Sequence, residues 1–296
     1  METPAESNQP ISASKKMQQM MRRYPLFFFF LITYTFSWIV SIPYILSEWG
    51  ILQGNFQLAF VLKGFGPFLT ALLMTWILEG NQGIKRLRKR IRDWKKSWFW
   101  YVLVLIGIPM LILIGIVLQP GATTNFQGLK PLLLVSYFFT YIAVFFGGGP
   151  LGEEPGWRGF ALPRLQQKHG PFWGTLLLGF LWSCWHLPDF LTSAQGGGPG
   201  TNFMTFLKNF PIFLLLVLSL AFLFTWIYNR NQGSVFMTLL AHASVNTPQV
   251  VLVPLFPAVT MTSLNLAAVI GFGVPALLVL LLTRGRLGYQ PSPEQA

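Results

Sequence analysis

The chain has few charged residues and almost no cysteine. Of its 296 residues, 10% are Asp, Glu, Lys or Arg and 53% are hydrophobic, a balance that excludes an ordinary soluble globular domain. The single cysteine, Cys184, excludes an internal disulfide framework. The sequence has no internal repeat and no matched pair of interrupted apolar segments, which mark many transporters. Its apolar runs also lack the alternation of period two that a membrane β-barrel needs.

Continuous apolar runs, each about 20 residues long and therefore long enough to cross a bilayer, recur along the sequence. They predict an all-α polytopic integral membrane protein with about eight transmembrane helices around a polar intramembrane cavity. The expected spans are 25–47, 57–78, 98–118, 131–147, 171–190, 205–228, 233–252 and 262–283.

The domain organisation follows from these spans. We expect one membrane-embedded domain over residues 25–286, with the polar motifs in residues 145–250. A polar cytoplasmic tail, 1–24, precedes it, and residues 1–14 of that tail are expected to be unstructured. A short tail, 287–296, follows it. The first run lacks a small-residue cleavage site, so we expect an uncleaved anchor.

Basic residues outnumber acidic ones by 21 to 9, and their positions predict an orientation. If the N-terminus is cytoplasmic and eight spans alternate, all but three of the 21 Lys and Arg residues fall on the cytoplasmic side. The exceptions are Lys63, Lys130 and Lys208. This asymmetry is the positive-inside rule. It predicts a multi-pass protein, in a plasma or cell membrane, with both termini in the cytoplasm.

A basic run between two spans suggests contact with lipids. Ile84, Leu87, Ile91 and Trp94 recur at helical spacing among eight basic residues in 84–96. This pattern is typical of an amphipathic helix on anionic headgroups. Nucleic-acid binding is the alternative, but the adjacent spans place membrane phosphates nearby. We therefore expect membrane lipids, and no nucleic acid, as partners. The sequence does not indicate an oligomeric state.

The first of three polar islands within the apolar runs follows the glycines and proline of 147–150. It contains the adjacent carboxylates Glu153 and Glu154, followed by Pro155 and Arg158. Charged groups at membrane depth are costly and therefore need a partner or a function. The prolines and glycines predict that one helix ends and another begins here, with Pro155 in its first turn. In that helix Glu154 and Arg158, four residues apart, form an ion pair.

The second and third islands contain two of the chain's three histidines. His186 lies near the end of the fifth expected span, where Pro188 is expected to close the helix and Asp189 to orient the imidazole. His242 and Asn246, four residues apart, share one face of the seventh span. Pro248 is expected to interrupt that span. Each island alone is also explained by interhelical hydrogen bonds or a structural ion pair.

Together the three islands contain the groups that peptide hydrolysis requires. A carboxylate with a nearby imidazole can activate water, and a second imidazole with a carboxamide can hold an oxyanion. Ser183 and Cys184 are poorly spaced from His186 to act as nucleophiles. Two Glu and two His could also bind zinc, but there is no HExxH motif. The sequence therefore favours no cofactor and no metal, with a zinc site as the alternative.

These motifs, in this order, resemble the CPBP family of intramembrane proteases, which includes type II CAAX prenyl proteases and bacteriocin-processing or Abi proteins. The family pattern is Glu-Glu-x-x-x-Arg, aromatic-x-x-x-His and His-x-x-x-Asn. The corresponding residues are Glu153, Glu154 and Arg158, then Trp182 and His186, then His242 and Asn246. The aromatic residue of the second motif is usually Phe in the family and is Trp182 here. The resemblance covers about residues 145–250.

The resemblance implies an intramembrane endopeptidase of eight helices whose cavity opens toward the cytoplasm. It implies that Glu153 is the general base on water, assisted by His186. His242 and Asn246 would form the oxyanion hole, and Glu154 and Arg158 would support the site. The substrate would be a membrane-associated peptide or lipidated protein, processed as in CAAX or in bacteriocin and pheromone maturation. A proton-coupled transporter and a non-catalytic scaffold or immunity protein remain alternatives.

Overall fold

The computed structural model describes residues 13–199 and 201–291, and within them every regular segment is helical. The α-helices are α1 (Ala13–Arg23), α2 (Pro25–Glu48), α3 (Gln57–Gly64), α4 (Gly66–Ile91), α5 (Trp98–Val102), α6 (Ile108–Val117), α7 (Leu133–Phe146), α8 (Pro150–Gly156), α9 (Leu162–Trp185), α10 (Phe203–Arg230), α11 (Val235–Val251) and α12 (Met261–Leu282). Two π-helical turns are η1 (Leu103–Gly107) and η2 (Trp157–Ala161), and three 3₁₀ turns are η3 (Leu187–Leu191), η4 (Ser193–Gln195) and η5 (Val253–Leu255). The all-α class expected from the sequence is confirmed.

Six of the eight expected spans are helices long and apolar enough to cross a membrane. They are α2, α3 with α4, α5 with α6, α10, α11 with η5, and α12. The other two, 131–147 and 171–190, belong to a helix pair, residues 133–146 and 150–191, that is bent by 44°. The described residues therefore contain six membrane-length helices, or seven if the bent pair is one span.

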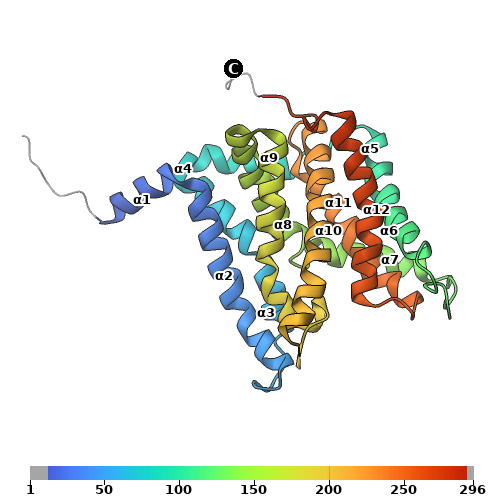
Figure 1. Ribbon diagram of the computed structural model, residues 1–296. Coiled ribbons are helices and arrows are strands. Elements are labelled where there is room, and N and C mark those ends of the chain that lie inside the picture. Colours follow the sequence, from blue (N-terminus) through green and yellow to red (C-terminus); the bar gives the residue numbers. More distant parts are fainter. Residues whose placement is uncertain (1–12, 200, 292–296) are drawn as a thin grey trace, which may run out of the picture.

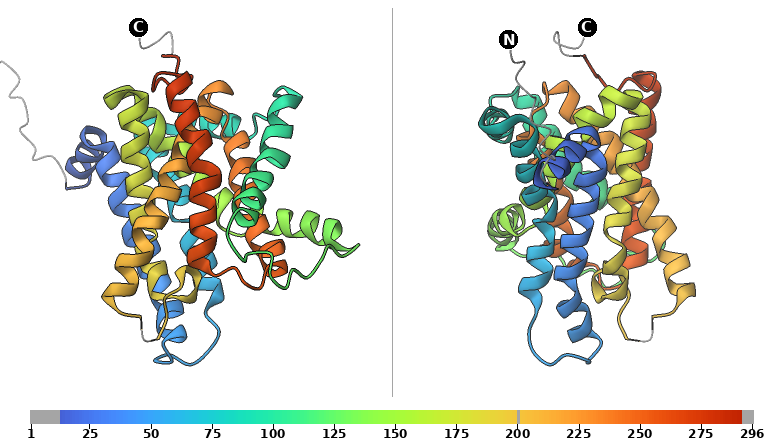
Figure 2. Two further views of the ribbon diagram at one scale, coloured as in Figure 1. Left: turned by 45° about the vertical axis from the view of Figure 1, so that its right-hand side comes forward. Right: turned by 90° about the vertical axis from the view of Figure 1, so that its left-hand side faces the viewer.

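The shortness of α7 explains this difference from the expected count. Its 14 residues extend about 21 Å, less than the roughly 30 Å of the hydrocarbon core. Helix α9 is interrupted at Gly170, whose φ is 75°, so only a short apolar segment of the helix follows the break. In both views of Figure 2, α7 runs across the direction of α2, α10 and α12, and none of its residues is buried.

The motif helix α8 lies inside the bundle, between α4 and α11 (Figure 1). It approaches the junction of α3 and α4 closely because its contact residues are glycines. A Cβ atom on Gly152 would lie 2.3 Å from the carbonyl oxygen of Gly64, and one on Gly156 would lie 2.6 Å from that of Pro67. Small residues at four-residue spacing let two helix backbones meet in this way. This glycine seam places the first polar island at the centre of the molecule.

Two prolines behave differently from the sequence expectation. The new helix begins at Pro150, five residues before Pro155, because the turn at Gly147–Gly149 ends there and Pro150 fits the first helical position. Pro155 therefore lies inside α8, and the π-helical turn η2 follows it directly. Pro248 does not interrupt the seventh span, since α11 continues through it to Val251.

The polar segments at the two ends of the chain also differ from the simplest expectation. Residues 1–12 and 292–296, half of each expected tail, lie outside the described residues. Residues 13 and 14, expected to be unstructured, are the first of helix α1, which is anchored where Arg22 donates to the carbonyl of Ile77 at 2.8 Å. The basic run is helical only to Ile91, so Trp94 lies outside the helix and is exposed.

The glycine seam makes a stability prediction. Replacing Gly156 with Ala adds a methyl group against backbone atoms that cannot move aside, so we expect unfolding to become easier by about 1–3 kcal/mol. The measurement is thermal unfolding of the purified protein in detergent. Gly273→Ala in α12 is the control, because its Cβ would meet nothing closer than 3.7 Å. Equal unfolding temperatures for the two variants would contradict the tight seam.

Candidate active site

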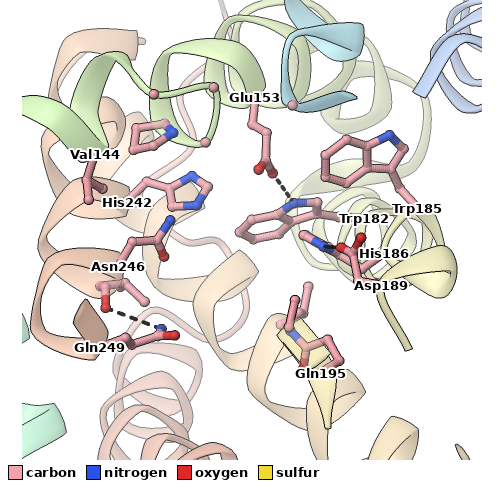
Figure 3. A pocket seen from close by; sticks show the side chains of 18 of the residues that line it. Val144, Glu153, Trp182, Trp185, His186, Asp189, Gln195, His242, Asn246 and Gln249 are labelled. Atoms are coloured by element: carbon pink, nitrogen blue, oxygen red, sulfur yellow. Dashed lines mark hydrogen bonds and ion pairs between the residues drawn. The ribbon is translucent and has the colours of Figure 1, made fainter. Parts of the chain in front are cut away.

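A cavity of about 370 Å³ brings the three polar islands together. Figure 3 shows Glu153, His186 and His242 pointing into it from different helices. Its wall also includes the turn at 147–150, part of α3, and one face each of α10 and α11. Six of the eight sequence-predicted site residues line the cavity directly: Glu153, Trp182, His186, Asp189, His242 and Asn246. Glu154 and Arg158 lie behind them and are fully buried.

Glu153 is held in the cavity wall by two tryptophans. The indole N–H of Trp182 donates to Glu153 Oε2 at 2.7 Å, and that of Trp157 donates to the same oxygen at 3.2 Å. None of the described residues donates a hydrogen bond to the other oxygen, Oε1. One carboxylate oxygen therefore fixes the side chain, and the other is free to receive a proton from a molecule in the cavity. Phe, the usual family residue at position 182, could not donate this bond.

Glu154 faces the protein interior and joins two of the islands. Its Oε1 lies 2.9 Å from Arg158 Nη1, which is the ion pair that the four-residue spacing predicts, and 2.9 Å from His242 Nδ1. Arg158 also lies over the ring of Trp182, with Cζ 4.3 Å from its centroid, a cation–π contact. With Nδ1 committed to Glu154, Nε2 is the ring nitrogen of His242 that is left for the cavity.

His186 is the C-cap of α9, and Asp189 is its partner, as the sequence predicts. His186 Nδ1 lies 2.8 Å from Asp189 Oδ2. The other carboxylate oxygen of Asp189 forms a buried ion pair with Lys63 of α3. Lys63 in turn lies 4.6 Å from the ring centroid of Trp185. Asp189, Lys63 and Trp185 therefore fix the imidazole of His186 from behind, each through contact with the next.

Asn246 lies one turn beyond His242 on α11, and both face the cavity (Figure 3). Its amide nitrogen approaches the turn at Gly149 so closely that a Cβ atom there would lie 3.3 Å away. Two hydrogen-bond donors, the imidazole of His242 and the amide of Asn246, can therefore point at one oxygen atom. They lie across the cavity from His186 (Figure 3), while the rings of Trp182 and His242 are in T-shaped contact with their centroids 5.6 Å apart.

The sequence analysis missed two residues that support this site. Lys63 was placed near the outer surface, but it is 2% exposed and pairs with Asp189; a lone lysine in an apolar run was the available signal. Arg90 was placed on the headgroups with the rest of the basic run. Its guanidinium donates to the carbonyls of Gly159 and Gly233, both at 3.1 Å, and so binds the π-helical turn. No pattern in the sequence distinguishes Arg90 from its basic neighbours.

Comparisons with known proteins show what part of the chain is similar to. Residues 135–248 match the family model of the type II CAAX prenyl endopeptidase Rce1-like proteins. Over these residues the chain is similar to this family of proteases. The matched segment begins in α7 and ends in α11, and it contains every motif residue from Glu153 to Asn246. The family supports a peptidase of the CAAX prenyl protease type, which acts within the membrane.

A curated relative extends the similarity beyond the matched segment. The chain is 22% identical over 227 residues to a "CAAX prenyl protease 2" of Methanococcus maripaludis, and the alignment covers 75% of this chain and 82% of the relative. Most of the membrane domain therefore has a counterpart in that protein.

The zinc alternative can be compared with the side chains that the structure brings together. Among residues 13–199 and 201–291, no three His, Cys, Asp or Glu side chains converge in a way that could hold a metal ion. Of the four side chains that the zinc alternative requires, Glu154 is engaged with Arg158.

The buried ion pair makes a second stability prediction. Glu154→Gln keeps the shape of the side chain but leaves Arg158 uncompensated inside the protein, so we expect a loss of about 3–5 kcal/mol. Thermal unfolding in detergent measures it. Glu79→Gln is the matched control, because Glu79 pairs with Arg86 at 2.7 Å where both are partly exposed and should lose about 1 kcal/mol or less. Recovery of stability in Glu154→Gln/Arg158→Met would support the charge as the cause, and equal losses for the two single variants would contradict it.

Proposed function

We propose that this protein is an intramembrane endopeptidase in which Glu153 activates water to hydrolyse a peptide bond. The observation that carries the proposal is the position of Glu153. Two indole N–H groups hold one of its carboxylate oxygens, and the other has no donor among the described residues. A general base needs this combination of a fixed orientation and a free lone pair.

The reaction would begin when Glu153 takes a proton from water, and the oxygen bonds to the carbonyl carbon of the scissile peptide. The imidazole of His242 and the amide of Asn246 would donate to the resulting oxyanion. Donation by His242 would use Nε2, because Nδ1 faces the carboxylate of Glu154. Donors arranged before the reaction, in a cavity of low dielectric, stabilise charge more than they would in water.

Collapse of the tetrahedral intermediate would break the C–N bond and require a proton on the leaving amine. The proton that Glu153 received can be returned to that nitrogen, which balances the hydrolysis. His186 can assist, because Nδ1 donates to Asp189 and the neutral ring then keeps a lone pair on Nε2. Glu154 and Arg158 would position His242 rather than contact the substrate.

The substrate would be a membrane-associated peptide or a lipidated protein, and membrane lipids would surround the enzyme. The printed names of the family and of the curated relative favour a prenylated CAAX-type substrate. The cavity itself selects for a peptide, since it offers polar groups from several helices and no separate nucleophile. Bacteriocin or pheromone maturation would use the same chemistry on an unprenylated peptide. The distribution of basic residues supports cytoplasmic termini.

The central experiment compares wild type with Glu153→Gln in detergent, on a peptide library that includes a prenylated tetrapeptide. We expect Glu153→Gln to lower kcat by at least about 10²-fold, because a general base contributes about 10²–10⁴-fold. Activity of the wild type should survive a chelator. Glu79→Gln, which removes a carboxylate far from the motifs, should cleave normally, and unfolding curves should show that Glu153→Gln is folded.

The outcomes separate the alternatives. Activity that is lost with chelator and restored by zinc would replace the glutamate mechanism with a metal one. Full activity in Glu153→Gln would exclude Glu153 as the base. A proton-coupled carrier would instead show substrate-driven proton uptake in vesicles, and a scaffold would keep its function in the variant.

A further prediction concerns Lys63, which we expect to act as a positioning residue for His186 through Asp189. Lys63→Met should lower kcat about 10- to 100-fold with little change in KM, less than the loss of a catalytic group itself. Asp189→Asn should have a similar effect, and the double variant should lose no more than either one, because the residues act in one chain. Lys63→Met and Asp189→Asn should each also change the dependence of kcat on pH. The control is Lys208→Met, an exposed lysine of α10. Additive losses would contradict the chain.

A further inference from the structure

Three carboxamide residues that line the cavity lie at one end of the helix bundle, and we take this end as the mouth. Gln249 lies two residues before the end of α11, Asn265 lies in the first turns of α12, and Gln195 precedes α10. The side-chain amide nitrogen of Asn265 donates to the side-chain Oε1 of Gln195 at 3.4 Å and joins the two sides of this rim. The same end holds the connections between α2 and α3 and between α9 and α10 (Figure 1).

The basic residues lie at the other end of these helices. Helix α10 ends at Arg230, and α12 leads to Arg284 and Arg286. Helix α11 begins after Ser234, whose hydroxyl donates to the carbonyl of Asp93 in the basic connection between α4 and α5. Helices α10, α11 and α12 therefore connect the basic end of the molecule with the mouth of the cavity (Figures 1 and 2).

A buried layer closes the cavity toward the basic end. Trp157, Arg158 and Phe224 have 0%, 0% and 1% of their surface exposed. The guanidinium of Arg158 lies over the rings of Trp182 and Phe224, 4.3 and 5.1 Å from their centroids. Beyond Arg158 the chain continues toward the basic end through Arg164. A substrate therefore cannot reach Glu153 from that end without displacing this layer.

Two sequence expectations thus conflict. The positive-inside rule assigns the basic end to the cytoplasm, while the family resemblance implies a cavity that opens toward the cytoplasm. The mouth lies opposite the basic end, so both cannot be true of this chain. We give more weight to the charges, because the structure itself gathers Arg230, Arg284, Arg286 and the basic connection after α4 at one end of the helices.

We propose that the substrate peptide reaches Glu153 from the extracytoplasmic side of the membrane, through a mouth lined by carboxamides. This inference rests on the proposed endopeptidase function. Gln195, Asn246, Gln249 and Asn265 line the cavity at or near its mouth. A carboxamide both donates and accepts, as a peptide group does, so these side chains suit an extended peptide backbone rather than a charged ligand. The substrate class is a peptide presented at the outer leaflet, such as an exported or membrane-anchored precursor.

The test of access requires no cleavage. Cys184 is the only cysteine, so Cys184→Ser provides a background without thiols. A new cysteine is then placed at the mouth, Gln249→Cys, or at the basic end, Lys168→Cys, which is an exposed position. A membrane-impermeant maleimide is applied to intact cells and to inverted vesicles. We expect Gln249→Cys to be labelled in cells and Lys168→Cys only in inverted vesicles.

Each other labelling result overturns the proposal. The reverse pattern would place the mouth in the cytoplasm and show that the charge rule fails for this chain. Labelling of both positions from one side would contradict the opposite-end geometry. No labelling of Gln249→Cys from either side would show that the mouth is closed. None of these results bears on whether Glu153 is catalytic.

A kinetic measurement tests the carboxamides separately. Gln249→Ala should raise KM about three- to tenfold with kcat nearly unchanged, which is the expected effect of losing one hydrogen bond to bound substrate. Gln167→Ala, exposed near the basic end, should leave KM unchanged. An unchanged KM in Gln249→Ala, with extracytoplasmic labelling intact, would reject the peptide-binding role of the mouth. Loss of all cleavage in the wild type would instead reject the endopeptidase function.

Discussion

The structure depends on the compensation of charge inside the membrane domain. An unpaired guanidinium at this depth would cost several kcal/mol, and Arg158 is completely buried. Glu154 supplies the opposite charge and at the same time accepts from His242, which lies on α11. Arg158 also faces the rings of Trp182 and Phe224. One ion pair therefore ties together α8, α9, α10 and α11, and it is the reason that three motifs far apart in sequence meet in one cavity.

This compensation is possible only because irregular backbone is buried in protein rather than exposed to lipid. Helix α8 is short, contains Pro155 and continues into the π-helical turn η2. Arg90 donates to the carbonyls of two residues of that turn, Gly159 and Arg158. The glycine seam with α4 supplies the close packing. π-helical turns of this kind are frequent at functional sites.

The sequence was sufficient to predict the fold class, most spans and the local pairs. Four-residue spacing predicts the Glu154–Arg158 pair, and three-residue spacing predicts that Asp189 contacts His186, because helical geometry fixes both. It could not predict contacts between distant segments. Lys63 meets Asp189 across 126 residues, and hydropathy says nothing about such a pairing. It also overestimated the number of spans, since an apolar run does not show that Gly170 breaks a helix or that α7 runs across the bundle.

The two adjacent glutamates show how the fold assigns different roles to identical side chains. Successive residues on a helix point about 100° apart, so only one of Glu153 and Glu154 can face the cavity. Glu154 is enclosed with a cation and an imidazole, and its carboxylate is already engaged as an acceptor with both. Glu153 receives only the neutral indole N–H groups of Trp182 and Trp157, both on one oxygen. The second oxygen of Glu154, Oε2, is buried without a partner, so a free lone pair alone does not distinguish the two residues. A base must also reach water, and of the two glutamates only Glu153 lines the cavity.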